Sequence, residues 1–288
     1  MFIQYNDENV KTIAFADDTV ILASGMTWSD ASTKLETALS KIFGYMCTSK
    51  LKINAQKSNF MAFAASKLSI PKELSIKIHA SGCDKQQCIC EEHKRTESTK
   101  YLGIIIHQNL KWDCHINYIT NKIRRLQYGF KIMAQVCSTK RALQIYHALV
   151  ESLLSYGLLL WGGSYEKILK PIKIIQKRIL KIILHKPKLY PTIQLFNDCK
   201  IMNITQLYTL QICKHIFYTD IKLIDHPYQT RAKCRLTTKI SKANKTITQS
   251  FFINRLPKIY NAMPDNIKKT KSNRSYIRKV KEWIKATI

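Results

Sequence analysis

The stretch TIAFADDTVILASG, residues 12–25, places two adjacent carboxylates, Asp17 and Asp18, between two apolar runs. Residues 13–16 and 19–23 are rich in β-branched side chains, so the pattern predicts two short strands joined at the aspartates. Two carboxylates at such a tip repel one another without a counter-ion, and Mg²⁺ prefers carboxylates together with substrate phosphates. The alternative is an ordinary Asp-Asp turn on the surface.

Helical and strand-like patterns follow the aspartates. Apolar residues at helical spacing over residues 29–48 predict a helix, with Ser29 or Asp30 as its N-cap. Residues 51–53 and 60–64, separated by a polar turn, predict a second hairpin. The order of hairpin, helix and hairpin, without a βαβ repeat, predicts an α+β unit in which a helix covers one face of a sheet.

The second part of the chain is predicted to be mostly helical. Two strands, in IKIHASG and KYLGIIIHQNL, precede it. Apolar stripes at helical spacing run through residues 116–133, 143–154, 170–183, 204–217 and 275–286. Ser138 or Thr139 suits the start of the second stripe, and Pro171 suits the first turn of the third.

The chain is strongly basic. It carries 47 Lys and Arg against 19 Asp and Glu, a net charge of +28, and residues 226–288 hold 16 of these cations and 2 of the acids. This excess favours a polyanionic partner, with nucleic acid ahead of an anionic membrane surface. The alternative is a solvated, lysine-rich surface.

FADD, followed by TVILASG, a helix, LKINAQKSNFMAF and KYLGIIIHQNLKWDCHI, forms an ordered series of motifs. The series resembles the C-terminal part of the reverse transcriptases of non-LTR (LINE-type) retrotransposons, closest to jockey-like elements. The resemblance continues through RALQIYHALVESLLSYGLLLWGGS, IIQKRILKIIL and FFINRLPKIYNAMPDNIK. It implies a palm remnant with the FADD hairpin over residues 1–65, a β-rich region like a primer grip over 66–113, a helical thumb over 114–200 and a basic helical region over 201–288.

The resemblance also implies a metal site. Asp17 would be the principal Mg²⁺ (or Mn²⁺) ligand for two-metal nucleotidyl transfer, and Asp18 a secondary ligand. Phe15 stands where many reverse transcriptases have tyrosine. Lys57 matches the lysine of the N-x-x-K motif that begins at Asn54, where it would neutralise or protonate pyrophosphate; the alternative is a solvated turn lysine.

Nucleic-acid contacts are implied at two places. Tyr101, Leu102 and Gly103 match the turn that grips the primer end, where glycine allows a close backbone approach. The basic face of the thumb would track the phosphates of an RNA template and a DNA primer. The cations on that face are Lys173, Lys177, Arg178 and Lys181.

Three residues that follow the primer-grip turn complete the comparison. Trp112 and His115 match the tail of the motif and are expected to be packing residues. His107 departs from the family, which usually has aspartate at this position. The departure lies outside the chemistry and weakens the resemblance only slightly.

Parts of the family's active site have no counterpart in this sequence. Only sixteen residues precede Asp17, and none of them supplies the third metal-binding aspartate or the fingers that bind dNTP. The expectation is a fragment of a longer polymerase that is inactive alone and uses dNTP only with an upstream part. The alternative is a non-enzymatic RNA- or DNA-binding protein retained from a retrotransposon, which explains the charge but not the aspartates.

The cysteines suggest a further site and a compartment. Cys83, Cys88, Cys90 and His93 form the pattern C-x4-C-x-C-x2-H, but Cys88 and Cys90 are closer than in the usual C-x2-C zinc knuckle, so free thiols are favoured over zinc. The chain has nine cysteines, an odd number, and lacks a secretion signal and an 18-residue apolar run. These features predict an intracellular protein of the nucleus or cytoplasm, neither secreted nor transmembrane.

Overall fold

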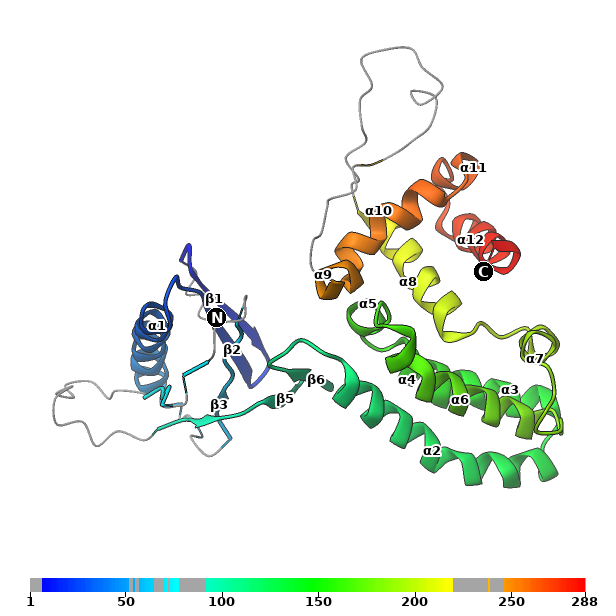
Figure 1. Ribbon diagram of the computed structural model, residues 1–288, viewed down its shortest axis with the longest axis horizontal. Coiled ribbons are helices and arrows are strands. Elements are labelled where there is room, and N and C mark those ends of the chain that lie inside the picture. Colours follow the sequence, from blue (N-terminus) through cyan, green and yellow to red (C-terminus); the bar gives the residue numbers. More distant parts are fainter. Residues whose placement is uncertain are drawn as a thin grey trace, which may run out of the picture. The chain divides into compact units, whose positions relative to one another are not determined.

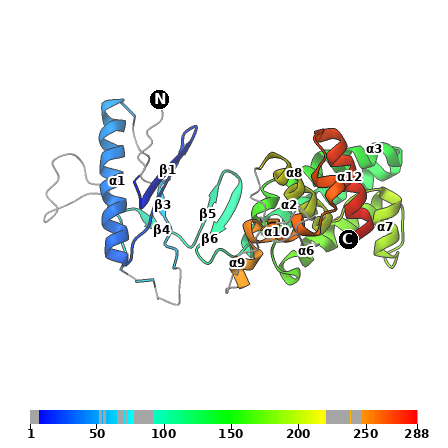
Figure 2. The same cartoon turned by 90° about the horizontal axis from the view of Figure 1, so that it is seen from above.

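The computed structural model divides the chain into two compact units, residues 1–101 with 106–109 and residues 102–105 with 110–288 (Figures 1 and 2). The residues that it describes are 7–51, 54, 57–64, 70–71, 73–77, 92–219, 238 and 246–287. The first unit combines short strands with one long helix, and the second is helical. The predicted α+β class is therefore confirmed.

The aspartates lie at the tip of an antiparallel hairpin in the first unit. Strand β1 (Val10–Phe15) pairs with β2 (Asp18–Ala23), and Phe15 lies opposite Asp18 in the register. The two turn residues are thus Ala16 and Asp17, whereas Asp18 begins β2. The predicted joint at Asp17-Asp18 is wrong by one residue, because the last ladder pair extends to Asp18.

Helix α1 (Trp28–Thr48) packs against this hairpin. Val10 and Thr12 are buried, while Ile13 on the alternate face of β1 is 49% exposed, so the face that contains Val10 and Thr12 carries the small core. The predicted N-caps of α1 are wrong. Thr27 is the cap, because its hydroxyl accepts the backbone N–H of Asp30 at 3.1 Å.

The second hairpin predicted from the sequence falls only partly on the described residues. Strand β3 (Asn59–Phe60) pairs in parallel with β4 (Lys94–Arg95). Residues 52–53 of the expected partner strand lie outside the described residues. Of the strand expected in IKIHASG, Lys77 forms a bridge to Glu92, and residues 78–82 again lie outside the described part.

KYLGIIIHQNL forms a hairpin rather than a single strand. Strands β5 (Ser98–Tyr101) and β6 (Ile104–His107) flank the two-residue turn of Leu102 and Gly103. Both turn residues have positive φ, 44° and 81°, as the favoured two-residue hairpin turn requires.

The helical unit begins after this hairpin. Its helices are α2 (Asp113–Val136), α3 (Thr139–Tyr146), the π-helical turn η1 (His147–Glu151), α4 (Ser152–Ser155), α5 (Leu158–Trp161), α6 (Glu166–Ile183), α7 (Thr192–Cys199), α8 (Ile204–Tyr218), α9 (Thr246–Ser250), α10 (Phe252–Ala262), α11 (Asp265–Lys268) and α12 (Asn273–Thr287). The five predicted apolar stripes lie on α2, on α3 to α4, on α6, on α8 and on α12. These helices are therefore confirmed, while α5, α7, α9, α10 and α11 were not predicted as individual helices.

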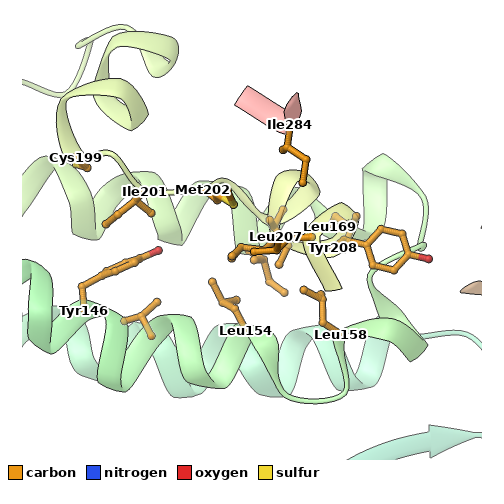
Figure 3. Packing of buried hydrophobic residues seen from close by; sticks show 14 of the residues in the cluster. Tyr146, Leu154, Leu158, Leu169, Cys199, Ile201, Met202, Leu207, Tyr208 and Ile284 are labelled. Atoms are coloured by element: carbon orange, nitrogen blue, oxygen red, sulfur yellow. The ribbon is translucent and has the colours of Figure 1, made fainter. Parts of the chain in front are cut away.

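Apolar side chains from most of these helices share one core. Leu154 of α4, Leu158 of α5 and Leu207 of α8 point toward one another in Figure 3. Phe130 and Trp161 are fully buried in the same cluster. At about 25 cal/mol per Å² of apolar area removed from water, this burial is the main stabilising contribution to the unit.

Pro171 does not lie in a first turn, as the sequence suggested. Helix α6 begins at Glu166, so Pro171 lies inside the helix and cannot donate the hydrogen bond to residue 167. Leu169, which precedes the proline, is 5% exposed in the core. Burial of this side chain offsets the lost hydrogen bond and extends the helix upstream of the proline.

Gln176 is a polar side chain in the helical core, with 1% of its surface exposed. Its Nε2 donates to the hydroxyl of Tyr146 at 2.9 Å and to the carbonyl of Met202 at 3.1 Å. Burial raises the pKa of Tyr146, so this hydroxyl is neutral at physiological pH. The amide thereby joins α6 to α3 and to the segment before α8.

Replacing Gln176 with leucine should lower the free energy of unfolding by about 1–3 kcal/mol, because two buried acceptors lose their donor. Tyr146→Phe removes one of these acceptors. The free energy of unfolding of the double variant should therefore fall by less than the sum of the losses in the two single variants. Urea unfolding followed by circular dichroism measures all three, and strictly additive losses would contradict the assignment.

Candidate functional site

Asp17 and Asp18 are both exposed at the tip of the β1–β2 hairpin. Asp18 lies opposite Phe15, so their side chains share a face with Ile13 and Leu22. This face is open, because Phe15 is 62% exposed and Leu22 is 46% exposed. Ala16 has a φ of 54°, a strained value for a residue with a side chain, and this bend presents the adjacent Asp17 at the turn.

The chemistry of this tip suits a hard divalent cation. Neither aspartate forms an ion pair within the part of the chain that the structure describes, and both carboxylates are open to solvent. Oxygen ligands of this kind are those that Mg²⁺ prefers. The described residues contain no group of three His, Cys, Asp or Glu that could hold a metal ion. Within the described part of the chain, the tip therefore offers two carboxylates and no third group of these types.

Lys57 lies in an exposed turn of the same unit, built by Asn54. The side-chain oxygen of Asn54 accepts the backbone N–H of Lys57 at 3.2 Å, and its carbonyl accepts the N–H of Ser58 at 3.1 Å. The spacing of asparagine and lysine therefore has a local structural reason. Among the described residues, the Lys57 ammonium makes no ion pair with either aspartate.

The turn at Leu102 and Gly103 is held by the corner between α4 and α5. The hydroxyl of Tyr156 donates a hydrogen bond to the carbonyl oxygen of Leu102 at 2.5 Å. A Cβ atom added to Gly103 would lie 3.3 Å from the ring of Tyr156. The indole N–H of Trp161 in turn donates to the carbonyl of Tyr156 at 3.1 Å. Tyr101 is half-buried, and its hydroxyl has no partner among the described residues.

Gly157 allows this corner to form. It has a φ of 60°, and a Cβ at this position would lie 2.5 Å from Cδ1 of Ile104. The absence of a side chain therefore removes both a backbone strain and a steric overlap.

His115 supports the same hairpin from α2. Its Nδ1 accepts the backbone N–H of Ile105 at 3.2 Å, and its ring packs edge-on against Trp161 at 5.9 Å between centroids. The side chain is 1% exposed, and burial lowers its pKa to about 4. The expectation that His115 is a packing residue agrees with these contacts.

The predicted basic face lies on α6, and its four cations differ. Lys173 forms an ion pair with Glu166 at 2.7 Å, and Lys181 donates to the carbonyl of Lys188. Lys177 and Arg178 make no ion pair within the described residues. The latter two are therefore the cations of this face that are open to a phosphate.

The possible zinc ligands cannot be brought together from the described residues, since Cys83, Cys88 and Cys90 lie outside them. His93 is 8% exposed, its backbone N–H donates to the carbonyl of Ile76, and its Nδ1 has no partner among the described residues. The five cysteines that the structure describes are free thiols, and burial raises the pKa of Cys213 to about 12.

Sequence reasoning missed Tyr156 and Gly157, which secure the turn of Leu102 and Gly103. Their local signal is a glycine after a tyrosine within the apolar run LLSYGLLLWGG, a position where a helix is interrupted. Their partners lie more than fifty residues earlier, with 54 positions between Tyr156 and Leu102. No local pattern connects the two segments.

Comparison with known proteins places the chain beside RNA-directed DNA polymerases of mobile elements. The RNA-directed DNA polymerase from mobile element jockey of Drosophila melanogaster is 24% identical over 223 residues, which cover 74% of this chain and 23% of that protein. The probable RNA-directed DNA polymerase from transposon BS of the same organism is 24% identical over 204 residues, 70% of this chain and 21% of that protein. The resemblance to jockey-type reverse transcriptases is confirmed.

The chain spans less than a quarter of the length of these curated relatives. No protein-family model matches it, and no solved structure matches it. Within the described part of the chain, none of the helices combines the length and the apolar character needed to cross a bilayer.

Gly157→Ala should lower the free energy of unfolding by about 2 kcal/mol, from a strained positive φ and the overlap with Ile104. Ile104→Val removes the overlapping Cδ1 atom, so the double variant should lose less than the two single variants together. Gly129→Ala is the control. Its Cβ would lie 3.9 Å from Met133 inside a helix, and it should raise stability by about 0.5–1 kcal/mol. Chemical denaturation measures each change.

Acid should destabilise the helical unit through His115. Because burial lowers its pKa from 6.5 to about 4, the unfolded state binds a proton that the folded state excludes. Stability is fully present above pH 6.5 and falls by about 3 kcal/mol as the pH approaches 4. His115→Asn, which retains an acceptor for Ile105, should flatten this decline in denaturation curves between pH 7 and 4.5. The exposed His185→Asn should not.

Proposed function

We propose that this chain is a part of a mobile-element RNA-directed DNA polymerase and that Asp17 and Asp18 contribute to its metal site. The observation that carries the proposal is the exposed pair of carboxylates at the tip of a two-residue hairpin. It occurs in a chain whose relatives are RNA-directed DNA polymerases. The positive φ of Ala16 is what a two-residue hairpin turn requires, with or without a metal site.

In this proposal Asp17 is the principal ligand of Mg²⁺ (or Mn²⁺), and Asp18 is a secondary ligand. When bound, the metal ions activate the primer 3′-hydroxyl and stabilise the departing pyrophosphate. The hairpin contributes rigidity, because its six-pair ladder from Val10 to Phe15 leads directly to the tip. Lys57 supplies a solvent-exposed ammonium for the pyrophosphate.

The same proposal assigns the RNA template and the DNA primer to the basic and turn regions. The turn of Leu102 and Gly103 presents backbone with little side-chain cover, since Gly103 is exposed. Lys177 and Arg178 on α6 contact phosphates, which fixes register without reading sequence. Residues 1–65 then act as the end of a palm and residues 114–200 as a thumb.

Residues 1–288 alone are proposed to be inactive in polymerisation. The two aspartates provide only part of a metal shell, and the described residues bring no third carboxylate, histidine or cysteine to them. Catalysis and dNTP binding would then require the further polymerase segments that the much longer relatives contain.

A second candidate function is a non-enzymatic protein that binds RNA or DNA. The net charge of +28 favours it, because binding through phosphates needs cations and no metal site. It gives no role to the exposed aspartates, which weaken binding to a polyanion. The metal site distinguishes the two candidates.

Mn²⁺ should bind residues 1–288 weakly, on the order of millimolar, because two carboxylates provide few ligands. Asp17→Asn should weaken this binding further in an electron paramagnetic resonance titration, and Glu8→Gln, which removes an exposed carboxylate of the same unit, should not.

Primer extension on an RNA template should be undetectable for residues 1–288 and should appear in a longer chain that supplies the remaining motifs. Asp17→Asn in that chain should lower the rate by at least about 10²-fold. Extension that survives the substitution would remove Asp17 from the site, and extension by residues 1–288 alone would contradict the proposed inactivity.

A further inference from the structure

Helix α12 carries a line of cations on its outer face. Arg274, Arg278, Lys281 and Lys285 follow one another at intervals of four, three and four residues, and all four are exposed. This spacing places them along one side of a helix. A shallow hollow of about 370 Å³ lies among these side chains, lined by Arg274, Ile277, Arg278, Lys281, Glu282 and Lys285.

The orientation of this face is fixed by the opposite side of the helix. Tyr276, Val280 and Ile284 are buried in the core, and α12 packs against α8. The Tyr276 hydroxyl donates to the carbonyl of Cys213 at 3.0 Å, and the Asn273 amide donates to the hydroxyl of Tyr218. The helix therefore cannot rotate its cations inward without losing these contacts.

The fold does not require these four charges. Within the described residues none of them forms an ion pair, and the nearby Glu282 does not pair with them either. Like charges three or four positions apart destabilise a helix, and Arg274 also lies in the first turn, where the helix dipole disfavours a cation. Lys279 differs from them, because it donates to the hydroxyl of Thr270. The helix dipole favours only Lys285, which lies in the last turn. The repulsion among the four cations, which no ion pair within the described residues offsets, indicates an external anion.

We infer that the outer face of α12, defined by Arg274, Arg278, Lys281 and Lys285, binds the phosphate backbone of a nucleic acid. The assignment rests on the proposed function and names a surface for it beyond the thumb. At 1.5 Å per residue the four cations extend over about 16 Å, which corresponds to about five phosphates along one strand of a duplex. Arginine guanidinium groups can contact such phosphates through two parallel hydrogen bonds.

An anionic membrane is the other polyanion that a basic helix could meet. An interfacial helix buries its apolar face in the lipid. In α12 that face already lies in the protein core through Tyr276, Val280 and Ile284. Only the charged face remains available, and charge without apolar insertion favours nucleic acid over a membrane.

The test uses residues 1–288 and a fluorescein-labelled RNA–DNA hybrid duplex, with fluorescence anisotropy between 50 and 200 mM salt as the readout. The variant R274Q/R278Q/K281Q/K285Q should bind at least about tenfold more weakly at 50 mM salt. The slope of log affinity against log salt should fall by up to about 3.6, since each lost phosphate contact contributes about 0.9. Its melting temperature should stay equal or rise, because like-charge repulsion is removed.

The matched control is R125Q/K131Q/K140Q/R141Q, which also removes two arginines and two lysines from exposed positions on α2 and α3. It should weaken binding less than the α12 variant. Glu282→Gln removes the carboxylate from the hollow and should strengthen binding about two- to fivefold. A gain of affinity is an effect that a damaged fold does not produce.

The outcomes separate this inference from the proposed function. If the wild-type chain binds the duplex and the α12 variant binds it equally well, or no more weakly than the control, the inference is overturned and the proposed function stands. If the wild-type chain binds no duplex even at 50 mM salt, the inference is overturned together with the assignment of template and primer contacts to this chain, whereas the proposed metal site is tested separately by Mn²⁺ binding. If the α12 variant loses binding to phosphatidylserine vesicles while its binding to the duplex is unchanged, the partner is a membrane and the inference is overturned.

Discussion

The hydrogen bond from the Tyr156 hydroxyl to the carbonyl of Leu102 fixes the turn of the β5–β6 hairpin, and the arrangement around the turn depends on it. Leu102 has a φ of 44°, which costs about 1–2 kcal/mol for a residue with a side chain. Tyr156 and the His115 ring, which accepts from Ile105, offset this strain. A turn that the local sequence disfavours is therefore held in place by helices α2, α4 and α5.

In the second unit, amphipathic helices place stabilising apolar side chains on one face and cations on the other. Helix α6 buries Leu169, Ile172 and Ile179 and leaves Lys177 and Arg178 at its surface. The apolar face supplies the stabilisation, so the opposite face is free to vary in charge without loss of the core. The β1–β2 hairpin carries charge of the opposite sign. Its small core contains Val10, and its exposed tip carries two carboxylates.

Periodicity predicted α2, α8 and α12 because burial of one helix face is encoded within a few turns of the chain. The partner of β3 was not predictable in this way, since β4 lies some 35 residues later and pairs in parallel. The proline inside α6 placed the predicted start of that helix near residue 170 rather than at Glu166, and α10, which was not predicted, also contains a proline. The aspartates were found from the order of motifs, whereas Tyr156, which holds the turn, leaves no signal near Leu102.

The distance in sequence between Leu102 and Tyr156 has a consequence during synthesis. The hairpin emerges from the ribosome before the helix corner that secures its turn, and 54 residues separate the two partners. At about 5–20 residues per second, the gap lasts roughly 3 to 11 s. During that interval no helix corner supports the strained turn at Leu102, so we expect the hairpin to form only after Tyr156 has been synthesised.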